Sequence, residues 1–319
     1  MSEIPSYDIG LLNRKFGEPG RIAFRAGPCG EPIAVIAEAR AAAEVSLYGG
    51  HILSYRPVGH SPVLWMTKSM METKPGKAIR GGIPVCWPWF GPGGEGRPSH
   101  GFARTARWNL LRTEHDAYST SVALVLEDSP ETRALWPHAF RLELEVTVGE
   151  KLFVSLTTEN TGKEPFSYTE ALHSYYRVKD ASLVQVLGLD GNAYIDKAPG
   201  GHDALQAGPI SFDQETDRVY PSAVGQCQIH DSGIRRRIHI EKAGSSATVV
   251  WNPWIDKAAT MKDMLPDDYK RFVCVETANA GAEPLVLAPG QSHEIHMEVT
   301  VDLLDMNGKP ITKETTSNK

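Results

Sequence analysis

The chain has 319 residues, a length that suits one large β or α/β domain or two domains of ordinary size. Hydrophobic residues make up 41% of the sequence and charged residues 23%, which is the composition of a globular protein able to bury a sizeable core. The formal net charge of −6 argues against nucleic acid and anionic membrane surfaces as partners, and no apolar run is long enough to span a bilayer.

The first residues and the cysteines both predict a reducing compartment. Residues 1–5 contain neither a basic region nor a following apolar segment, so we expect no secretion and a cytoplasmic location. Cys29, Cys86, Cys227 and Cys274 are far apart and form no C-x-x-C spacing. They are therefore predicted to be buried thiols, without a disulfide framework and without a zinc site.

Strand signals dominate the chain. Residues 1–28 are mixed in character and are predicted to form an irregular arm. Residues 45–48 and 51–55 flank Gly49-Gly50, which predicts a hairpin with a two-residue turn. Further strand candidates, several with period-two alternation, are residues 32–39, 61–66, 106–111, 119–127, 140–148, 152–158, 167–178, 183–187, 235–241, 247–251, 285–287 and 293–304.

Helical periodicity is scarce by comparison. Residues 131–136 and 257–264 are the two short helices that we expect, and residues 308–319 are a polar C-terminal tail. A dozen or more short strands separated by Gly and Pro indicate an all-β sandwich or barrel. We predict one large β domain over residues 29–307.

The segment 79–92 (IRGGIPVCWPWFGP) is the most unusual part of the sequence. Its prolines and aromatic residues disfavour both helix and sheet, so we expect a loop. A tryptophan-walled loop with an arginine at its entrance suits a sugar face that carries an anionic group. An equally good interpretation from these residues alone is a core loop with Arg80 as a solvated surface charge.

Three apparent motifs are not expected to carry chemistry. Residues 91–96 fit G-x-G-x-x-G, but no strand precedes them and no helix follows, so a surface turn is the better interpretation. In residues 293–296 (HEIH), the two histidines would point to opposite faces of a strand. Residues 235–237, three consecutive arginines, are predicted to be a solvated strand edge.

His173 and Glu276 are the best candidates for acid–base chemistry. His173 lies within an apolar and aromatic strand, and Glu276 ends an apolar one. Singly, each has a structural explanation, as a hydrogen-bonded core histidine and a charge at a strand end. As a pair, they could remove one proton while donating another near neutral pH. Partial burial would raise the pKa of Glu276, and a neighbouring carboxylate would favour protonated His173.

Six segments in one order along the chain resemble the hexose-phosphate mutarotase branch of the aldose 1-epimerase superfamily. They are residues 79–92 (IRGGIPVCWPWFGP), 100–104 (HGFAR), 171–176 (ALHSYY), 215–220 (ETDRVY), 249–254 (VVWNPW) and 261–276 (MKDMLPDDYKRFVCVE). The resemblance implies a large antiparallel β-sandwich of the galactose-mutarotase type, in agreement with the strand pattern.

The resemblance also implies the reaction and its two catalytic residues. Glu276 would act as general base on the anomeric hydroxyl while His173, as general acid, protonates the ring oxygen. The ring opens to the aldehyde, C1 turns about the C1–C2 bond, and closure gives the other anomer. Because only protons move, the resemblance implies neither a metal nor an organic cofactor.

Arg80 and Arg104 match the positions of a phosphate clamp in these relatives. Guanidinium is well shaped for bidentate contact with phosphate. The resemblance therefore implies a hexose 6-phosphate as substrate, and it disfavours a free-aldose 1-epimerase, which needs no such cations. A third interpretation, a non-catalytic sugar-phosphate binding or regulatory protein, is disfavoured by the presence of both His173 and Glu276.

Four further positions are implied to contact the substrate. His100 begins the HGFAR motif, and Asp217 matches an acidic position that orients a sugar hydroxyl. Ser99 stands where some relatives carry Gln, which puts one substrate contact in doubt. Trp87 is a candidate for stacking on the pyranose, as are Trp89 and Trp254, with core packing at least as good an interpretation for each. We expect a monomer whose partner is a small-molecule hexose 6-phosphate.

Overall fold

The computed structural model describes residues 7–28, 30–68, 76–281 and 283–311. Its strands are β1 (Ile22–Ala26), β2 (Pro32–Ala37), β3 (Ala41–Ser46), β4 (His51–Pro57), β5 (Val85–Cys86), β6 (Asn109–His115), β7 (Thr120–Glu127), β8 (Arg141–Val148), β9 (Leu152–Glu159), β10 (Phe166–Tyr168), β11 (Glu170–Leu172), β12 (Tyr175–Arg177), β13 (Val184–Leu187), β14 (Ala193–Asp196), β15 (Ala204–Leu205), β16 (Ile210–Ser211), β17 (Thr216–Tyr220), β18 (Cys227–Asp231), β19 (Arg236–Ala243), β20 (Ala247–Asn252), β21 (Phe272–Asn279), β22 (Leu285–Leu287) and β23 (Ser292–Leu303). The helices in the described residues are α1 (Ile9–Phe16), α2 (Pro130–Leu135) and α3 (Trp254–Thr260), with short 3-10 turns η2 (Ala103–Thr105), η3 (Ala181–Leu183) and η4 (Asp268–Arg271).

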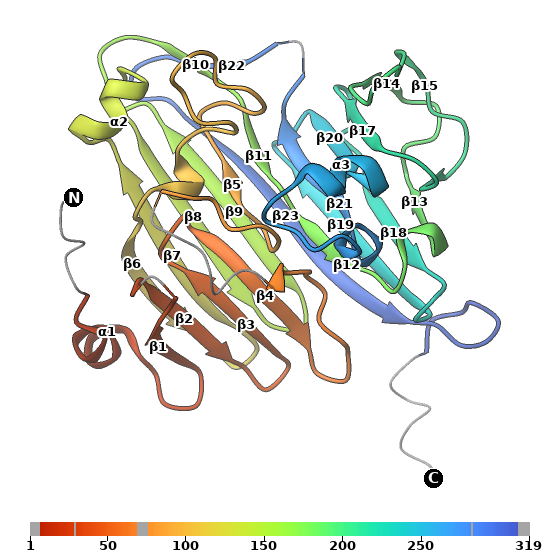
Figure 1. Cartoon of the computed structure of the whole chain (residues 1–319). Coiled ribbons are helices and arrows are strands. Elements are labelled where there is room, and N and C mark those ends of the chain that lie inside the picture. The colour runs from red at the N-terminus through yellow and green to blue at the C-terminus, as the bar shows by residue number, and fades with distance from the viewer. Residues whose placement is uncertain (1–6, 29, 69–75, 282, 312–319) are drawn as a thin grey trace.

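The largest layer is a nine-stranded antiparallel sheet in the order β16-β13-β18-β19-β23-β9-β8-β7-β6. Its long strand β23 pairs with β9 through its first half and with β19 through its second, and Figure 1 shows it crossing the molecule. Strand β8 shows why the sheet packs on one side: Leu142, Leu144 and Val146 are buried, whereas the residues between them are partly exposed. Alternation of this kind buries one face of a sheet and leaves the other in water.

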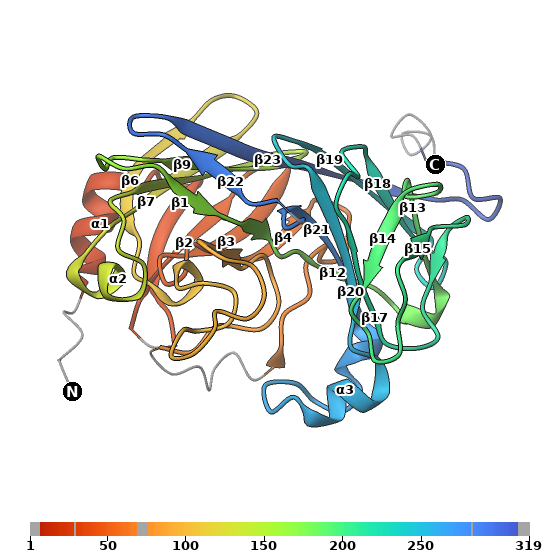
Figure 2. The same ribbon diagram turned by 90° about the horizontal axis from the view of Figure 1, so that it is seen from above.

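Two smaller sheets pack on that buried face and complete the sandwich. Strands β1 to β4 form one sheet, and the other has the order β15-β14-β17-β20-β21-β11-β5, with β12 also paired to β21. Figure 2 shows these two sheets next to each other, with β21 near the centre of the molecule. One hydrophobic cluster draws residues from all three sheets, among them Ile36, Leu144 and Val275.

Strand β21 is buried on both faces, which positions the site described below. All eight of its residues are buried. Val273 and Val275 face the central cluster, whereas Phe272 and Cys274 belong to a second cluster on the opposite face. By the same alternation, Glu276 faces the side of Cys274, away from the nine-stranded sheet.

The all-β sandwich expected from the sequence is confirmed. The hairpin over residues 140–158 forms as β8 and β9, with Val148 opposite Leu152. The helix expected at 131–136 is α2, and the one expected at 257–264 begins earlier, as α3 at Trp254. Among the helices in the described residues, none is long and apolar enough to cross a membrane.

The turn predicted at Gly49-Gly50 is wrong in length. Ser46 pairs with His51, so residues 47–50 form a four-residue loop between β3 and β4. Both glycines have positive φ, 80° and 54°. A Cβ on Gly49 would lie 2.5 Å from the carbonyl oxygen of Arg104, so this position requires glycine because of a close approach as well as a turn.

The irregular arm predicted for residues 1–28 is also wrong over most of its described part. The Asp8 carboxylate caps α1 by accepting from the Leu11 amide at 2.8 Å. Asn13 then ties α1 to β1, because its side chain bonds both the amide and the carbonyl of Phe24. Phe24 itself is buried in the central cluster, and β1 extends the first sheet. A single amide side chain makes these contacts, so no local sequence pattern predicts them.

The C-terminal tail was predicted for residues 308–319. Of these, residues 312–319 lie outside the described residues.

The solvated edge predicted for residues 235–237 is wrong as well. Strand β19 lies between β18 and β23, inside the nine-stranded sheet, so alternate residues face the core. Arg236 is 1% exposed, and its guanidinium donates to the carbonyl oxygens of Pro62 at 2.9 Å and of Arg177. Backbone carbonyls therefore accept from the two terminal nitrogens of this guanidinium in place of water.

Three of the cysteines agree with the prediction of buried thiols. Cys86, Cys227 and Cys274 are free and buried. Cys29 lies outside the described residues.

Candidate active site

The candidate site is built where one strand breaks beside β21. Strands β11 and β12 both pair with β21, and His173 and Ser174 interrupt them. The interruption is stabilised by the loop of residues 79–92. The His173 amide donates to the Pro84 carbonyl at 3.1 Å, and the Tyr175 amide donates to the Gly82 carbonyl at 2.9 Å. The break turns the His173 side chain toward the face of β21 that carries Glu276.

His173 and Glu276, the pair singled out in the sequence, lie in contact. His173 Nδ1 is 3.2 Å from Glu276 Oε1, and the two side chains are 8% and 1% exposed. The contact lacks hydrogen-bond geometry, and among the described residues neither His173 Nδ1 nor Glu276 Oε2 has a hydrogen-bond partner. Buried polar atoms normally have hydrogen-bond partners. A buried pair whose polar atoms lack such partners is therefore an arrangement suited to binding and reacting with a ligand.

Burial shifts both members of this pair toward their neutral forms. Burial lowers the pKa of His173 well below its usual value, and His100, Arg104 and Arg80 lower it further. Burial raises the pKa of Glu276 well above its usual value, with Asp217 adding to the rise; Lys197 and Arg104 oppose it. A buried carboxyl and imidazole held this way can exchange a proton with little change in net charge.

His100 stands next to the pair as a neutral hydrogen-bonding group. Its ring centre is 5.7 Å from that of His173 and 4.8 Å from that of Phe90. Burial, together with nearby Arg104 and Arg80, lowers the pKa of His100 to about 3. Its Nδ1 accepts from the Gly91 amide at 3.3 Å, so we assign the ring proton to Nε2, where it can be donated to a ligand.

The loop that carries His100 also sets Arg104 in place. Gly101 has φ of +73°, and a Cβ there would lie 1.9 Å from the Trp87 carbonyl oxygen, so only glycine fits. Arg104 follows in η2, and its Nη2 donates to the Ser99 carbonyl at 2.7 Å. Its buried Nε has no hydrogen-bond partner among the described residues. Ser99 thus contributes a backbone carbonyl that orients Arg104, while its own side chain is exposed.

Arg80, the other predicted phosphate ligand, is already engaged by protein groups. Its Nε and Nη2 each lie 3.0 Å from Asp263 Oδ2, and its Nη1 donates to the Tyr175 hydroxyl at 2.9 Å. Burial alone would lower the pKa of Arg80, but Tyr175 and Asp263 raise it overall. The Tyr175 ring in turn stacks on His173, with ring centres 4.8 Å apart and planes 8° apart. Arg80 therefore holds the Tyr175 hydroxyl, and the Tyr175 ring in turn holds the His173 ring by stacking.

Trp87 does not reach this site, and its assignment as a substrate contact is wrong. It is fully buried in the central cluster, with ring centres of Trp136 at 5.0 Å and Phe140 at 4.5 Å. Trp89 packs on the same cluster, and Trp254 packs on Tyr269. Position 87 faces the core because Cys86, one residue earlier on β5, faces the other side of the sheet.

Asp217 lies on the face of the sheet that holds the site. It pairs with Trp251, and its charge raises the pKa of Glu276. Burial raises the pKa of Asp217 itself, while Lys197 lowers it. The backbone amide of Lys197 donates to the Asp217 carbonyl at 2.7 Å.

Sequence reasoning missed three side chains that act on the site. Lys197 acts electrostatically on Glu276, His100 and Asp217, and its ammonium lies 5.9 Å from the Phe90 ring centre. Asp263 pairs with Arg80, and Trp251 lies edge-on to His173 at 6.0 Å. Trp251 lies within the strand predicted at residues 247–251, so its position was available from the sequence. No local pattern marks Lys197 or Asp263.

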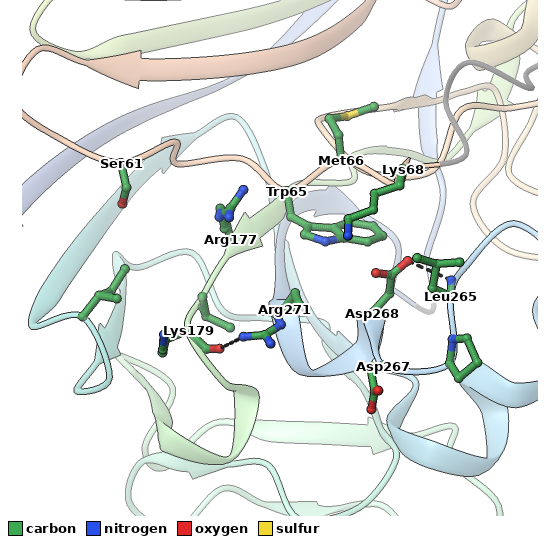
Figure 3. A pocket seen from close by; sticks show the side chains of 13 residues that line it. Ser61, Trp65, Met66, Lys68, Arg177, Lys179, Leu265, Asp267, Asp268 and Arg271 are labelled. Atoms are coloured by element: carbon green, nitrogen blue, oxygen red, sulfur yellow. Dashed lines mark hydrogen bonds between the residues drawn. The ribbon is translucent and has the colours of Figure 1, made fainter.

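A separate hollow of about 770 Å³ opens beside Trp65 and is not part of this site (Figure 3). Its lining includes Arg177, Lys179 and Arg271, and the Arg271 guanidinium donates to the Lys179 carbonyl at 2.7 Å. Trp65 packs against Tyr175, so the indole stands between the hollow and the ring that supports His173.

Comparison with known proteins gives consistent matches over most of the chain. The family described as Aldose 1-epimerase matches residues 33–300. Curated relatives named "Putative glucose-6-phosphate 1-epimerase" are 40% identical, one from Salmonella typhimurium over 75% of this chain and 80% of its own, and one from Escherichia coli over 79% and 84%. A crystal structure of a "putative mutarotase" from Salmonella typhimurium has a TM-score of 0.82 and 34% identity, covering 91% of this chain and 99% of that one.

The β-sandwich and these matches define an enzyme of the sugar-epimerase class. The chain belongs to the aldose 1-epimerase family.

Proposed function

We propose that the protein interconverts the α and β anomers of a hexose 6-phosphate, with D-glucose 6-phosphate as the first candidate. The observation that carries the proposal is the buried contact of 3.2 Å between His173 and Glu276, next to two arginines that act electrostatically on His173. The relatives' names point to the same sugar phosphate.

In this proposal Glu276 and His173 exchange protons with opposite ends of the hemiacetal. Because burial favours the neutral forms of both groups, the carboxyl proton of Glu276 first passes to His173. The Glu276 carboxylate then takes the proton of the anomeric hydroxyl while protonated His173 donates one to the ring oxygen, and the ring opens to the aldehyde. Rotation about C1–C2 and closure then give the other anomer, with the same two groups working in reverse. His100, with its proton on Nε2, is suited to donate a hydrogen bond to a sugar oxygen, and Asp217 to accept one.

Arg104 is proposed as the main phosphate ligand. It is half-buried, and its Nε has no hydrogen-bond partner among the described residues, whereas Arg80 is engaged by Asp263 and Tyr175. A buried unpaired donor is costly unless a ligand satisfies it. We assign Arg80 mainly to positioning Tyr175 against His173, with a contribution to the positive field at the phosphate.

The phosphate is also proposed to help the chemistry. Arg104 and Arg80 both lower the pKa of His173 by repelling the imidazolium. A bound phosphate carries negative charge, which would offset this repulsion and favour protonated His173. A sugar without phosphate would leave the repulsion in place. Preference for the phosphorylated sugar is then expected in the rate as well as in binding.

We further propose that one chain in the cytoplasm is sufficient for activity. All the residues assigned above come from a single chain of one sandwich domain, and the buried free thiols of Cys86, Cys227 and Cys274 suit a reducing compartment.

The test is exchange spectroscopy by NMR, which measures the rate of α–β interconversion at equilibrium. Purified protein is added to glucose 6-phosphate and, in parallel, to glucose. We expect acceleration of the phosphorylated sugar to exceed that of glucose by about ten- to a hundredfold, the worth of one or two charge-assisted hydrogen bonds. No acceleration of either sugar would contradict the proposed activity, and equal acceleration would contradict the phosphate assignment.

A further inference from the structure

The thiol of Cys274 lies beside the acid–base pair, although the proposed reaction does not use it. Cys274 precedes Glu276 by two residues on β21, so both side chains point to the same face. It is fully buried, and its backbone pairs with that of Tyr175. Burial raises the pKa of the Cys274 thiol well above its usual value, with Glu276 adding to the rise, so in the free protein it is a neutral thiol.

One ligand atom from each of His173, Cys274 and Glu276 lies within 4.8 Å of the other two. Four-coordinate zinc binds sulfur at about 2.3 Å and nitrogen or oxygen at about 2.0–2.2 Å, which places its ligands about 3.3–3.7 Å apart. The contact of 3.2 Å between His173 Nδ1 and Glu276 Oε1 already has nearly this separation. The thiol needs to approach by about 1 Å at most, within the reach of a change in side-chain rotamer.

The polar atoms needed for such a site are available. His173 Nδ1 and Glu276 Oε2 have no hydrogen-bond partner among the described residues, so a cation would replace no existing hydrogen bond at these atoms. His173 is 8% exposed at its side chain, which leaves an approach from solvent. Binding would deprotonate the thiol and release its proton to water.

We propose that His173, Cys274 and Glu276 form an inhibitory site for a thiophilic divalent cation, of which zinc is the representative. A thiolate–imidazole–carboxylate set favours zinc, cadmium or cobalt over magnesium and calcium, which prefer oxygen ligands. The cation occupies the imidazole nitrogen and the carboxylate together, so neither acid nor base is free while it is bound. The inhibitory part of this inference rests on the proposed function, whereas the binding part does not.

The binding part is tested with Co²⁺ alone, without substrate. The full chain is titrated with Co²⁺ and followed by the thiolate-to-cobalt charge-transfer absorption, and Zn²⁺ is then added to displace it. We expect one Co²⁺ per chain, a thiolate band, and loss of that band with stoichiometric Zn²⁺. Two variants, Cys274→Ala and Cys274→Ser, are expected to lose the band and to weaken binding at least tenfold. Cys227→Ala, which removes another buried thiol, is the matched control and should keep both.

The inhibitory part is tested in the NMR exchange assay with added Zn²⁺. Wild type and Cys227→Ala should lose their acceleration as Zn²⁺ is added, whereas Cys274→Ala should keep its basal acceleration and tolerate at least tenfold more Zn²⁺. Magnesium at the same concentration should have no effect. Equal zinc sensitivity of Cys274→Ala and wild type, or a cobalt band that survives in both Cys274 variants, would overturn the proposal.

The two kinds of failure can be told apart. A band that depends on Cys274 in a protein that accelerates no sugar would uphold the metal site and contradict the proposed function. Acceleration of sugar interconversion by a protein that shows no thiolate-to-cobalt band would uphold the proposed function and contradict the metal site.

Discussion

The two faces of the eight-stranded sheet each bury a glutamate, and the two carboxyls differ in their hydrogen bonding. Glu170 on β11 faces the nine-stranded sheet, where Asn279 donates to it at 2.9 Å and Thr158 at 3.5 Å. Glu276 on β21 faces the site, where Oε2 has no hydrogen-bond partner among the described residues and Oε1 contacts His173. Both side chains are at most 1% exposed.

This difference in hydrogen bonding distinguishes Glu170 from Glu276, the proposed base, better than burial does. Burial raises the pKa of both glutamates, that of Glu170 to about 8. A shifted pKa alone therefore does not identify the site. What distinguishes Glu276 is its neighbours: His173, whose Nδ1 has no hydrogen-bond partner among the described residues, and the cations Arg104 and Lys197. The predictions below test whether chemistry and stability divide between the two faces in this way.

The largest effect is expected from His173→Asn. Loss of the proposed general acid should lower the enzyme-catalysed exchange of glucose 6-phosphate by about a thousandfold, while binding of the sugar stays within severalfold. NMR exchange gives the rate, and titration calorimetry gives the binding. The matched control is His293→Asn, because His293 lies 3.9 Å from Glu170 on the other face. If both variants slow the reaction equally, the division between the faces does not hold.

The next effect is on stability, from Glu170→Gln. The pKa of Glu170 is raised in the folded protein. Its contribution to the free energy of unfolding is therefore fully present below its pKa in the unfolded chain, about 4.3, and is lost as pH rises through about 8. Glu170→Gln should remove that loss and gain about 3–4 kcal/mol relative to wild type between pH 5 and pH 8. Urea unfolding of both proteins across this pH range measures the difference. A difference in the free energy of unfolding that stays constant at every pH would show that folding does not change the pKa of Glu170.

Arg104→Ala should change which sugar is preferred. Loss of one charge-assisted phosphate contact is expected to lower kcat/KM for glucose 6-phosphate by about ten- to a hundredfold and to leave the slower reaction of glucose nearly unchanged. Arg97→Ala is the control, since Arg97 stacks on Trp89 and is exposed. An equal loss for both sugars would mean that Arg104 acts on the ring chemistry and not on the phosphate.

The smallest effect is expected from Trp87→Phe, which tests whether Trp87 packs in the core or contacts the substrate. Trp87 fills the core between Trp136 and Phe140, so the shorter ring should lower the free energy of unfolding by about 1–3 kcal/mol. The values of kcat and KM should stay as in wild type. A change in KM with unchanged stability would restore Trp87 as a substrate contact.

The sequence predicted the sandwich because strand alternation is local, as in β8 and β9. It failed at α1 and β1, which depend on one side chain, Asn13, bonding a residue eleven positions away. It failed at Arg236 for a related reason, because a basic side chain usually indicates solvent unless distant carbonyls satisfy it.

The candidate site divides in the same way. His173 and Glu276 were singled out from their strand context and from the family resemblance, but their contact depends on the break between β11 and β12. The pairing of Arg80 with Asp263 joins residues 183 positions apart and has no local pattern. Cys274 was set aside because its spacing to the other cysteines is uninformative. Its spacing of two from Glu276 on a strand was the informative one.

The most direct test of the acid–base account compares Glu276→Gln with Glu170→Gln in the NMR exchange of glucose 6-phosphate anomers. Both changes remove one buried carboxyl from the same sheet with little change in shape. We predict that Glu276→Gln loses the catalysed exchange by about a thousandfold and still binds the sugar phosphate, whereas Glu170→Gln keeps the wild-type rate within severalfold. Exchange by Glu276→Gln at the wild-type rate would contradict the assignment of Glu276 as the base.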